Sequence, residues 1–97
     1  MRVADRLAAT LEARLAPERL AIHDFSAAHA GHAGARPGGE SHFEVEIVAA
    51  AFAGLSRVAR QRLVLDAAAE LLRQEIHALT IRALTPAEWA ARQAATT

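Results

Sequence analysis

The chain has 97 residues, a length that suits one domain built around a single core. Eleven arginines balance eleven acidic residues, so the formal net charge is zero and the molecule as a whole does not attract polyanions such as nucleic acids. Because cysteine is absent, the chain alone forms no disulfide, thiol nucleophile or thiolate-bound metal centre, and no apolar run reaches the ~18–20 residues needed to span a bilayer.

The first half of the chain predicts a helix and two strands within one domain over residues 1–97. An amphipathic helix is indicated by apolar residues at every fourth position, Val3, Leu7, Leu11 and Leu15. Pro17 ends this helix, and from Arg19 the apolar period changes to two, which predicts a half-buried strand to about Ser26. A second strand is expected over residues 41–48, where polar residues alternate with Phe43, Val45 and Ile47. The initial helix does not resemble a signal peptide, so we expect a soluble cytoplasmic protein.

The second half of the chain begins with a predicted turn over residues 49–55, in which Gly54 supplies conformational freedom. Ser56 then has the side chain to cap a helix that runs to about Gln74. The apolar residues of this segment fit the helical period: Val64, Ala68, Leu71 and Leu72. A third strand is expected over residues 76–83, with its inward positions at Leu79 and Ile81.

The segment Thr85–Glu88 combines a capping box with proline at the first helical position, which predicts a last helix to about Ala94, anchored by Trp89. The element order is therefore α-β-β-α-β-α. Strands one and two should be antiparallel, whereas the helix between strands two and three suits a right-handed parallel crossover. The predicted fold class is α+β, with two layers and a three-stranded mixed sheet.

The stretch His29–Phe43 holds three of the five histidines and four of the five glycines. A loop of this length is usually functional or disordered, and we expect it to be the most mobile internal segment. If strands two and three are parallel, the loop enters strand two at the sheet end where His77 opens strand three. Neutral imidazole is a common ligand for borderline metals. The pattern therefore indicates half of a metal site that a partner completes.

A simpler interpretation is that the loop histidines are solvated and that His77 only terminates a strand. Two histidines are too few for a self-contained zinc site, for which three or four protein ligands are expected. Composition and spacing alone favour this simpler interpretation, and they leave the shared metal site open.

Five segments resemble the BolA family, in the right order and across nearly the whole chain. They are Gly39–Phe43, Phe52–Gly54 with Ser56, Arg60–Val64, Ile76–Leu79 and Thr85–Trp89. The resemblance implies a fold similar to class II KH domains and a role as an adaptor to monothiol glutaredoxins. In such complexes a [2Fe–2S] cluster is held by a glutaredoxin cysteine and a glutathione thiol on one side, and by BolA histidine on the other. The isolated chain is expected to bind no cofactor.

The resemblance also implies which histidines are ligands. The family's C-terminal histidine falls on His77. Its loop histidine, three residues after an Asx-x-Ser at the end of strand one, falls on His29 after Asp24–Ser26, and His32 is an alternative that could replace it. The lack of cysteine in this chain agrees with a partner that supplies the sulfur. We expect a monomer alone and a heterodimer with the glutaredoxin, without membrane attachment.

Three residues depart from the family pattern: Phe25 where glutamate is frequent, Gln61 where histidine is frequent, and Leu65 where tyrosine is frequent. Gln61 and Leu65 are expected on the helix, away from the proposed site. Phe25 adjoins the histidine-rich loop, where it either alters the partner-facing surface or packs under the loop, and we expect the second.

A DNA-binding transcriptional regulator is the alternative function. The first turns of the predicted helix contain three arginines, Arg57, Arg60 and Arg62. Positive charge at a helix N-terminus interacts unfavourably with the macrodipole, at a cost of about 0.3–1 kcal/mol, and a bound phosphate would offset that cost. The segment after Gly54 has no second glycine, however, so the GxxG loop by which KH domains bind single strands is missing. The preferred interpretation is a solvated basic helix start, neutralised by Glu44 or Asp66.

No catalytic site is predicted. No serine or lysine nucleophile stands beside a base, and no paired carboxylates occupy an evident cleft. We therefore expect a binding protein rather than an enzyme.

Overall fold

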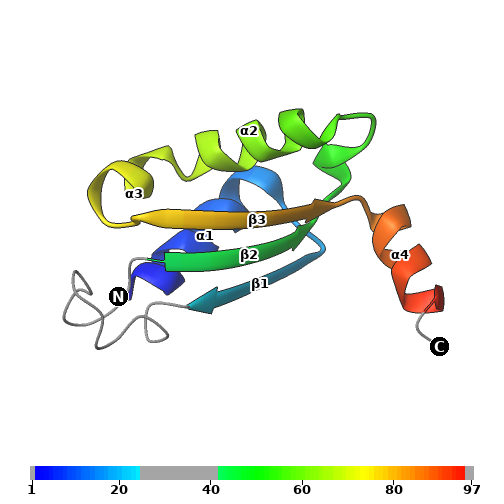
Figure 1. Ribbon diagram of the computed structural model, residues 1–97, viewed down its shortest axis with the longest axis horizontal. Coiled ribbons are helices and arrows are strands. Elements are labelled where there is room, and N and C mark those ends of the chain that lie inside the picture. The colour runs from blue at the N-terminus through cyan, green and yellow to red at the C-terminus, as the bar shows by residue number, and fades with distance from the viewer. Residues whose placement is uncertain (1, 25–41, 96–97) are drawn as a thin grey trace.

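The computed structural model describes residues 2–24 and 42–95. The predictions for Phe25, His29, His32 and the mobility of their loop lie outside these residues. In chain order the elements are helix α1 (Val3–Leu15), strand β1 (Arg19–Asp24), strand β2 (His42–Val48), 3₁₀ helix η2 (Ala50–Phe52), helix α2 (Arg57–Ala67), helix α3 (Ala69–Gln74), strand β3 (Ala78–Leu84) and helix α4 (Pro86–Ala95) (Figure 1).

The sheet has the predicted mixed topology, with strands in the order β1-β2-β3. Strand β1 pairs antiparallel with β2, and β2 pairs parallel with β3. In this register His42 lies opposite Ala78, and Asp24 lies opposite Phe43. The end of β1 and the beginnings of β2 and β3 therefore lie at the same end of the sheet, as expected for a parallel crossover between β2 and β3.

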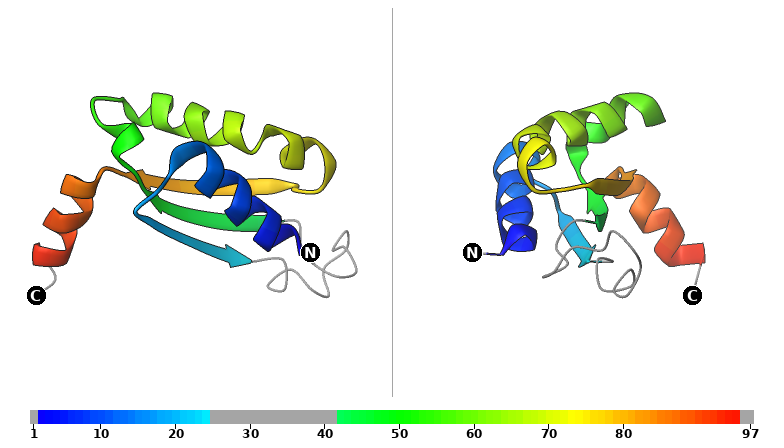
Figure 2. Two further views of the ribbon diagram at one scale, coloured as in Figure 1. Left: turned by 180° about the vertical axis from the view of Figure 1, so that it is seen from behind. Right: turned by 60° about the vertical axis from the view of Figure 1, so that its left-hand side comes forward.

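Helices α1, α2 and α3 cover one face of the sheet (Figures 1 and 2). The predicted alternation along β2 is confirmed, because Phe43, Val45 and Ile47 are fully buried while the residues between them are half-exposed. These strand residues join one core cluster whose helical members include Leu7, Leu11, Val64 and Leu71. The predicted stripe of the first helix is confirmed in the same way, since the buried residues of α1 are Leu7, Leu11 and Leu15.

The expected single helix from Ser56 to about Gln74 is wrong in one respect, because it is divided into α2 and α3 at Ala68. The Ser56 cap is confirmed: its hydroxyl oxygen accepts a hydrogen bond of 3.1 Å from the N–H of Ala59. Ala68 has φ −97° and ψ 8°, outside helical values, and its side chain is 1% exposed. The bend keeps Ala67, Ala68 and Leu71 all buried, and no proline or glycine marks it in the sequence.

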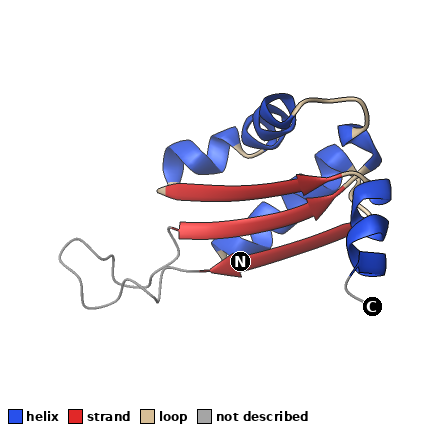
Figure 3. Ribbon diagram, turned by 45° about the vertical axis from the view of Figure 1, so that its right-hand side comes forward, coloured by secondary structure: helices blue, strands red, loops and turns tan. Residues whose placement is uncertain are grey.

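Helix α4 stands at the end of the sheet opposite the start of β3 (Figure 3). Its predicted capping box is confirmed: the Glu88 N–H donates to the Thr85 hydroxyl at 3.1 Å, and the Thr85 N–H donates to the Glu88 carboxylate at 2.9 Å. Trp89 is half-buried, and the Arg19 guanidinium lies 4.6 Å from the centre of its ring. None of the residues of α4 is fully buried, so polar contacts and this stacking hold the helix in place.

The strongest of these polar contacts is the ion pair between Arg60 and Glu88, with N–O distances of 2.6 and 3.1 Å. The hydrogen bonds from Arg60, with a further one from the Thr85 N–H, lower the pKa of Glu88 from its ordinary value of 4.5 to about 2. A carboxylate with a depressed pKa stabilises the folded state above its ordinary pKa, and this contribution is lost as the pH falls through the folded value. The docking of α4 should therefore weaken between about pH 4.5 and about pH 2.

Trp89, the only tryptophan of the chain, reports this docking through its fluorescence. In the unchanged protein we expect the emission to shift to longer wavelength as the pH falls through that range. In Glu88→Gln we expect the shifted emission already at neutral pH. Circular dichroism recorded on the same samples separates release of α4 from general acid unfolding. The control is Glu70→Gln, which affects only exposed contacts within α3, with Arg73 and Gln74, and should leave the emission unchanged. Identical titrations of Glu88→Gln and the unchanged protein would contradict the expected role of this pair.

Candidate functional site

His77 lies immediately before β3. It is at the end of the sheet where β1 ends and β2 begins, so the connection between these strands, residues 25–41, starts and finishes there. The strand begins two residues later than predicted, at Ala78, but His77 lies at the predicted end of the sheet. The His77 side chain is exposed, so its imidazole reaches solvent. A partner protein can therefore approach this imidazole directly.

The backbone on either side of His77 is held in place. Ile76 is 4% exposed, and its N–H donates to the Leu71 carbonyl at 2.9 Å. The preceding residue, Glu75, receives two hydrogen bonds from Arg6 of α1, at 2.7 and 2.5 Å. On the other side, Ala78 pairs with His42 in the sheet. His77 is thus an exposed side chain on a backbone fixed by the core, α1 and β2.

The other described histidines do not complete a metal site with His77. His42 is half-exposed at the start of β2, and His23 is exposed on β1, opposite Glu44. Over residues 2–24 and 42–95 no group of three or more histidine, aspartate or glutamate side chains is arranged to hold a metal ion. The predicted loop ligands His29 and His32 lie outside the described residues. Asp24 and His42, the described residues on either side of residues 25–41, lie at the same end of the sheet as His77.

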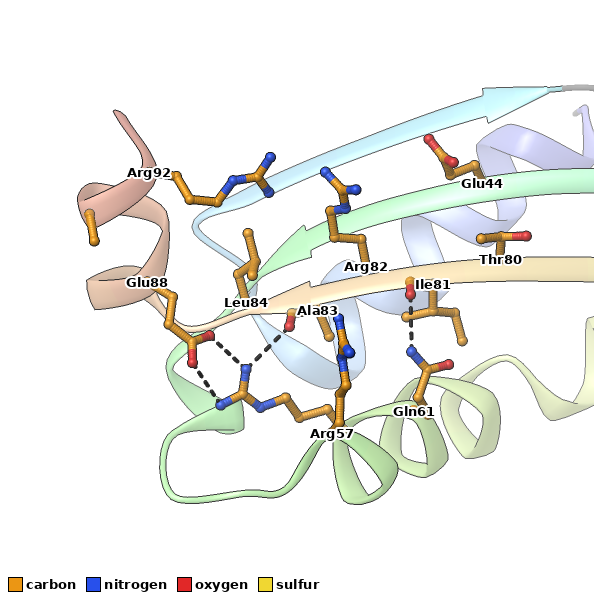
Figure 4. A pocket seen from close by; sticks show the side chains of 12 residues that line it. Glu44, Arg57, Gln61, Thr80, Ile81, Arg82, Ala83, Leu84, Glu88 and Arg92 are labelled. Atoms are coloured by element: carbon orange, nitrogen blue, oxygen red, sulfur yellow. Dashed lines mark hydrogen bonds and ion pairs between the residues drawn. The ribbon is translucent and has the colours of Figure 1, made fainter. Parts of the chain in front are cut away.

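A second candidate region is a groove of about 850 Å³ beside β3, at the α4 end of the molecule (Figure 4). We call it the arginine groove. Its floor is Thr80–Leu84 of β3 with Glu44 of β2, and its walls come from the first turn of α2 and from α4. The lining side chains that carry charge are Glu44, Arg57, Arg60, Arg82, Glu88 and Arg92.

Of the three arginines that the sequence grouped together, only Arg57 and Arg60 line this groove, and Arg62 is exposed elsewhere on α2. The side chain of Arg60 is 14% exposed, and besides Glu88 it donates to the carbonyls of Leu55 at 3.1 Å and Ala83 at 3.3 Å. The hydrogen bonds to Glu88, together with the charge of that carboxylate, raise the pKa of Arg60 above its already high ordinary value. The expected neutralisation by Glu44 or Asp66 is wrong for Arg60, because the capping carboxylate of α4 takes that place.

The helix position of Gln61 is confirmed, and the structure gives it a role that the sequence did not suggest. Its side-chain amide donates to the carbonyl of Ile81 at 3.0 Å (Figure 4). Leu65 is 38% exposed on the same helix. Two functional candidates, Arg82 and Arg92, were missed because they belong to other elements and are far from Arg57 in the sequence.

Residues 11–88 match the family model described as BolA-like protein. The chain belongs to the BolA family. The matched region runs from the middle of α1 to the first turn of α4, so it includes the whole sheet, His77 and most of the arginine groove. The resemblance predicted from the five segments is thus confirmed, together with the α+β fold.

Solved structures agree with this assignment to the BolA family. The structure of BolA1 from Arabidopsis thaliana aligns with a TM-score of 0.78 at 44% sequence identity, covering 88% of this chain and 93% of that one. Among curated relatives, SufE-like protein 1, chloroplastic/mitochondrial, of the same plant is 45% identical over 87 residues, which cover 86% of this chain. The DNA-binding transcriptional regulator BolA of Vibrio cholerae is 52% identical over 52 residues, or 54% of this chain.

This BolA-like chain spans 24% of the length of the plant SufE-like protein and 49% of the Vibrio protein. Among the helices that the structure describes, none is both long enough and apolar enough to cross a membrane.

Proposed function

We propose that this BolA-like protein is an adaptor that binds a monothiol glutaredoxin and supplies histidine to a shared [2Fe–2S] cluster in iron–sulfur assembly, trafficking or iron sensing. The observation that carries the proposal is the placement of His77. The His77 side chain is exposed, and the backbone on both sides of the residue is fixed. His77 also lies at the end of the sheet where the histidine-rich stretch joins the fold. Its role is binding rather than catalysis.

The donor chemistry of the chain supports a shared site. The chain has five histidines and no cysteine, so every thiolate ligand of a cluster must come from elsewhere. A glutaredoxin cysteine and a glutathione thiol supply such ligands, and imidazole nitrogen is an accepted ligand of [2Fe–2S] iron. We assign His77 as the rigid ligand and His29 as the second, with His32 as the alternative. The cytoplasmic location stays a prediction from the sequence pattern.

The reduction potential tests whether histidine contacts the iron. Replacing thiolate by neutral imidazole on one iron raises the potential of a [2Fe–2S] centre, as Rieske centres show. We therefore expect the complex of this protein with its glutaredoxin to have a higher potential than the glutaredoxin's own all-thiolate cluster. A redox titration of the two samples side by side measures the difference. Equal potentials would contradict histidine ligation.

DNA binding is a second candidate, favoured by the name of the Vibrio relative and by the basic residues Arg57, Arg60 and Arg62. The contacts of Arg60 with Glu88 leave Arg57 and Arg62 as the exposed members of the three. If phosphate is the ligand, binding should weaken steeply as salt rises, with a slope that follows the number of phosphates contacted. An oligonucleotide titration at several salt concentrations measures this slope, and a flat response would exclude the DNA-binding function.

A further inference from the structure

The arginine groove contains cationic side chains that the proposed cluster site does not use. Arg57, Arg82 and Arg92 project from α2, β3 and α4 (Figure 4). Arg57 and Arg92 are exposed and have no hydrogen-bond or ion-pair partner within the described part of the chain, and Arg82 reaches Glu46 only at 4.0 Å. Arginine offers a planar set of donors that matches a carboxylate with two parallel hydrogen bonds. The groove therefore presents unpaired carboxylate-binding groups on α2 and α4, with the loosely paired Arg82 on β3 between them.

The edge of β3 along the groove is already occupied by side chains of α2. Gln61 donates to the Ile81 carbonyl, and Arg60 donates to the Ala83 carbonyl. Such capping blunts an edge strand against pairing with another strand. A partner is therefore recognised by its side chains rather than by addition of a strand to the sheet.

The signs of the charges distinguish two classes of partner. Glu44 lines the groove, and Glu46 lies on the same face of β2, 3.4 Å from Arg19 and 4.0 Å from Arg82. A nucleic acid carries one negative charge per phosphate along its length, so these carboxylates would repel it. A protein segment with acidic side chains at intervals can place carboxylates on the arginines and neutral or basic residues near Glu44.

We propose that the arginine groove is a docking site for an acidic segment of a partner protein, with Arg57, Arg82 and Arg92 binding its carboxylates. The groove begins at Thr80, three residues after His77, and ends at Leu84. At roughly 3.3 Å per residue, its far end lies about 23 Å from His77 along β3. This docking site is distinct from His77 and does not depend on cluster binding.

The test uses a fluorescein-labelled peptide of alternating glutamate and glycine, and its binding is followed by fluorescence anisotropy at low ionic strength. The double variant Arg57→Glu with Arg92→Glu should weaken binding by roughly tenfold or more, because attractive charge pairs become repulsive. The matched control is Arg14→Glu, since Arg14 is also exposed and without a partner in the described chain but lies on α1. His77→Ala should leave peptide binding unchanged, so a failure of the cluster proposal does not affect this result.

Circular dichroism of each variant verifies folding, and the milder pair Arg57→Gln with Arg92→Gln should give a smaller loss of binding in the same direction. No binding of the acidic peptide, or equal weakening by Arg14→Glu, would overturn the proposal. So would tighter binding of a single-stranded thymidine oligonucleotide that depends on the same two arginines, because it would identify the groove as a nucleic-acid site.

Discussion

The variant His77→Ala is expected to lose the visible absorption of the mixed cluster while keeping its fold. His77 is the exposed histidine whose backbone the core, α1 and β2 hold in position, so we expect it to be the principal ligand from this chain. Removing an exposed side chain costs little stability, usually within about ±0.5 kcal/mol. The measurement mixes the purified variant with a monothiol glutaredoxin, iron, sulfide and glutathione, and records the visible and circular dichroism spectra.

The two loop histidines should behave differently from His77. We expect His29→Ala to leave a weaker or shifted spectrum, since His32 or solvent can take the vacant position, and His29→Ala with His32→Ala to weaken it further. His23→Ala is the matched control, because His23 is also exposed but lies in β1, opposite Glu44. Full retention of the spectrum in His77→Ala would exclude the ligand role, and equal, complete losses from His77→Ala and His29→Ala would refute the asymmetry.

The main elements could be predicted because burial follows local periodicity in this chain. Every fourth residue of α1 is buried at Leu7, Leu11 and Leu15, and alternate residues of β2 are buried, so a pattern in sequence becomes a face in space. The break at Ala68 could not be predicted in this way. It satisfies the packing of α2 and α3 over the sheet, and its residue is a good helix former with no local breaking signal.

The position of His77 was predictable for a topological reason. A helix between two strands favours a parallel crossover, and a parallel pair places the start of β3 beside the start of β2. No comparable topological rule predicts the arginine groove from the sequence. Arg57, Arg82 and Arg92 come from three elements. Packing of α2 along β3 brings Arg57 near Arg82, and the docking of α4 through Arg60 and Glu88, which are 28 residues apart, adds Arg92. Charge pairs at that separation leave no periodic trace in a single sequence.

The exposed sites and the buried core also predict opposite outcomes for mutation. Phe52 lies in η2 between β2 and α2, and its side chain is fully buried in the core cluster. Truncating a buried phenylalanine to alanine typically costs about 3–5 kcal/mol through lost transfer free energy and the cavity that remains. For a domain near 100 residues, whose unfolding free energy is about 5–15 kcal/mol, this is a large fraction of the total.

We therefore expect Phe52→Ala to lower the melting temperature by roughly 12–40 °C, at about 4–8 °C per kcal/mol. Thermal and urea unfolding followed by circular dichroism measure the loss. The control Val58→Ala removes an apolar side chain that is 58% exposed on α2 and should change the unfolding free energy by less than about 0.5 kcal/mol. A loss below about 1 kcal/mol in Phe52→Ala would show that the core closes around the missing ring.

Phe52 follows the C-terminal end of β2, and His77 lies at the opposite end of the sheet. The variant Phe52→Ala therefore separates the stability of the fold from ligation of the cluster. Well below its melting temperature, Phe52→Ala should still form the mixed cluster with the glutaredoxin, because the backbone contacts of Ile76 and Ala78 are unchanged. His77→Ala should show the reverse, with normal melting and no mixed cluster. If Phe52→Ala remains folded yet forms no cluster, the backbone around His77 is not held independently of the core near Phe52. The assignment of His77 as a rigid ligand would then fail.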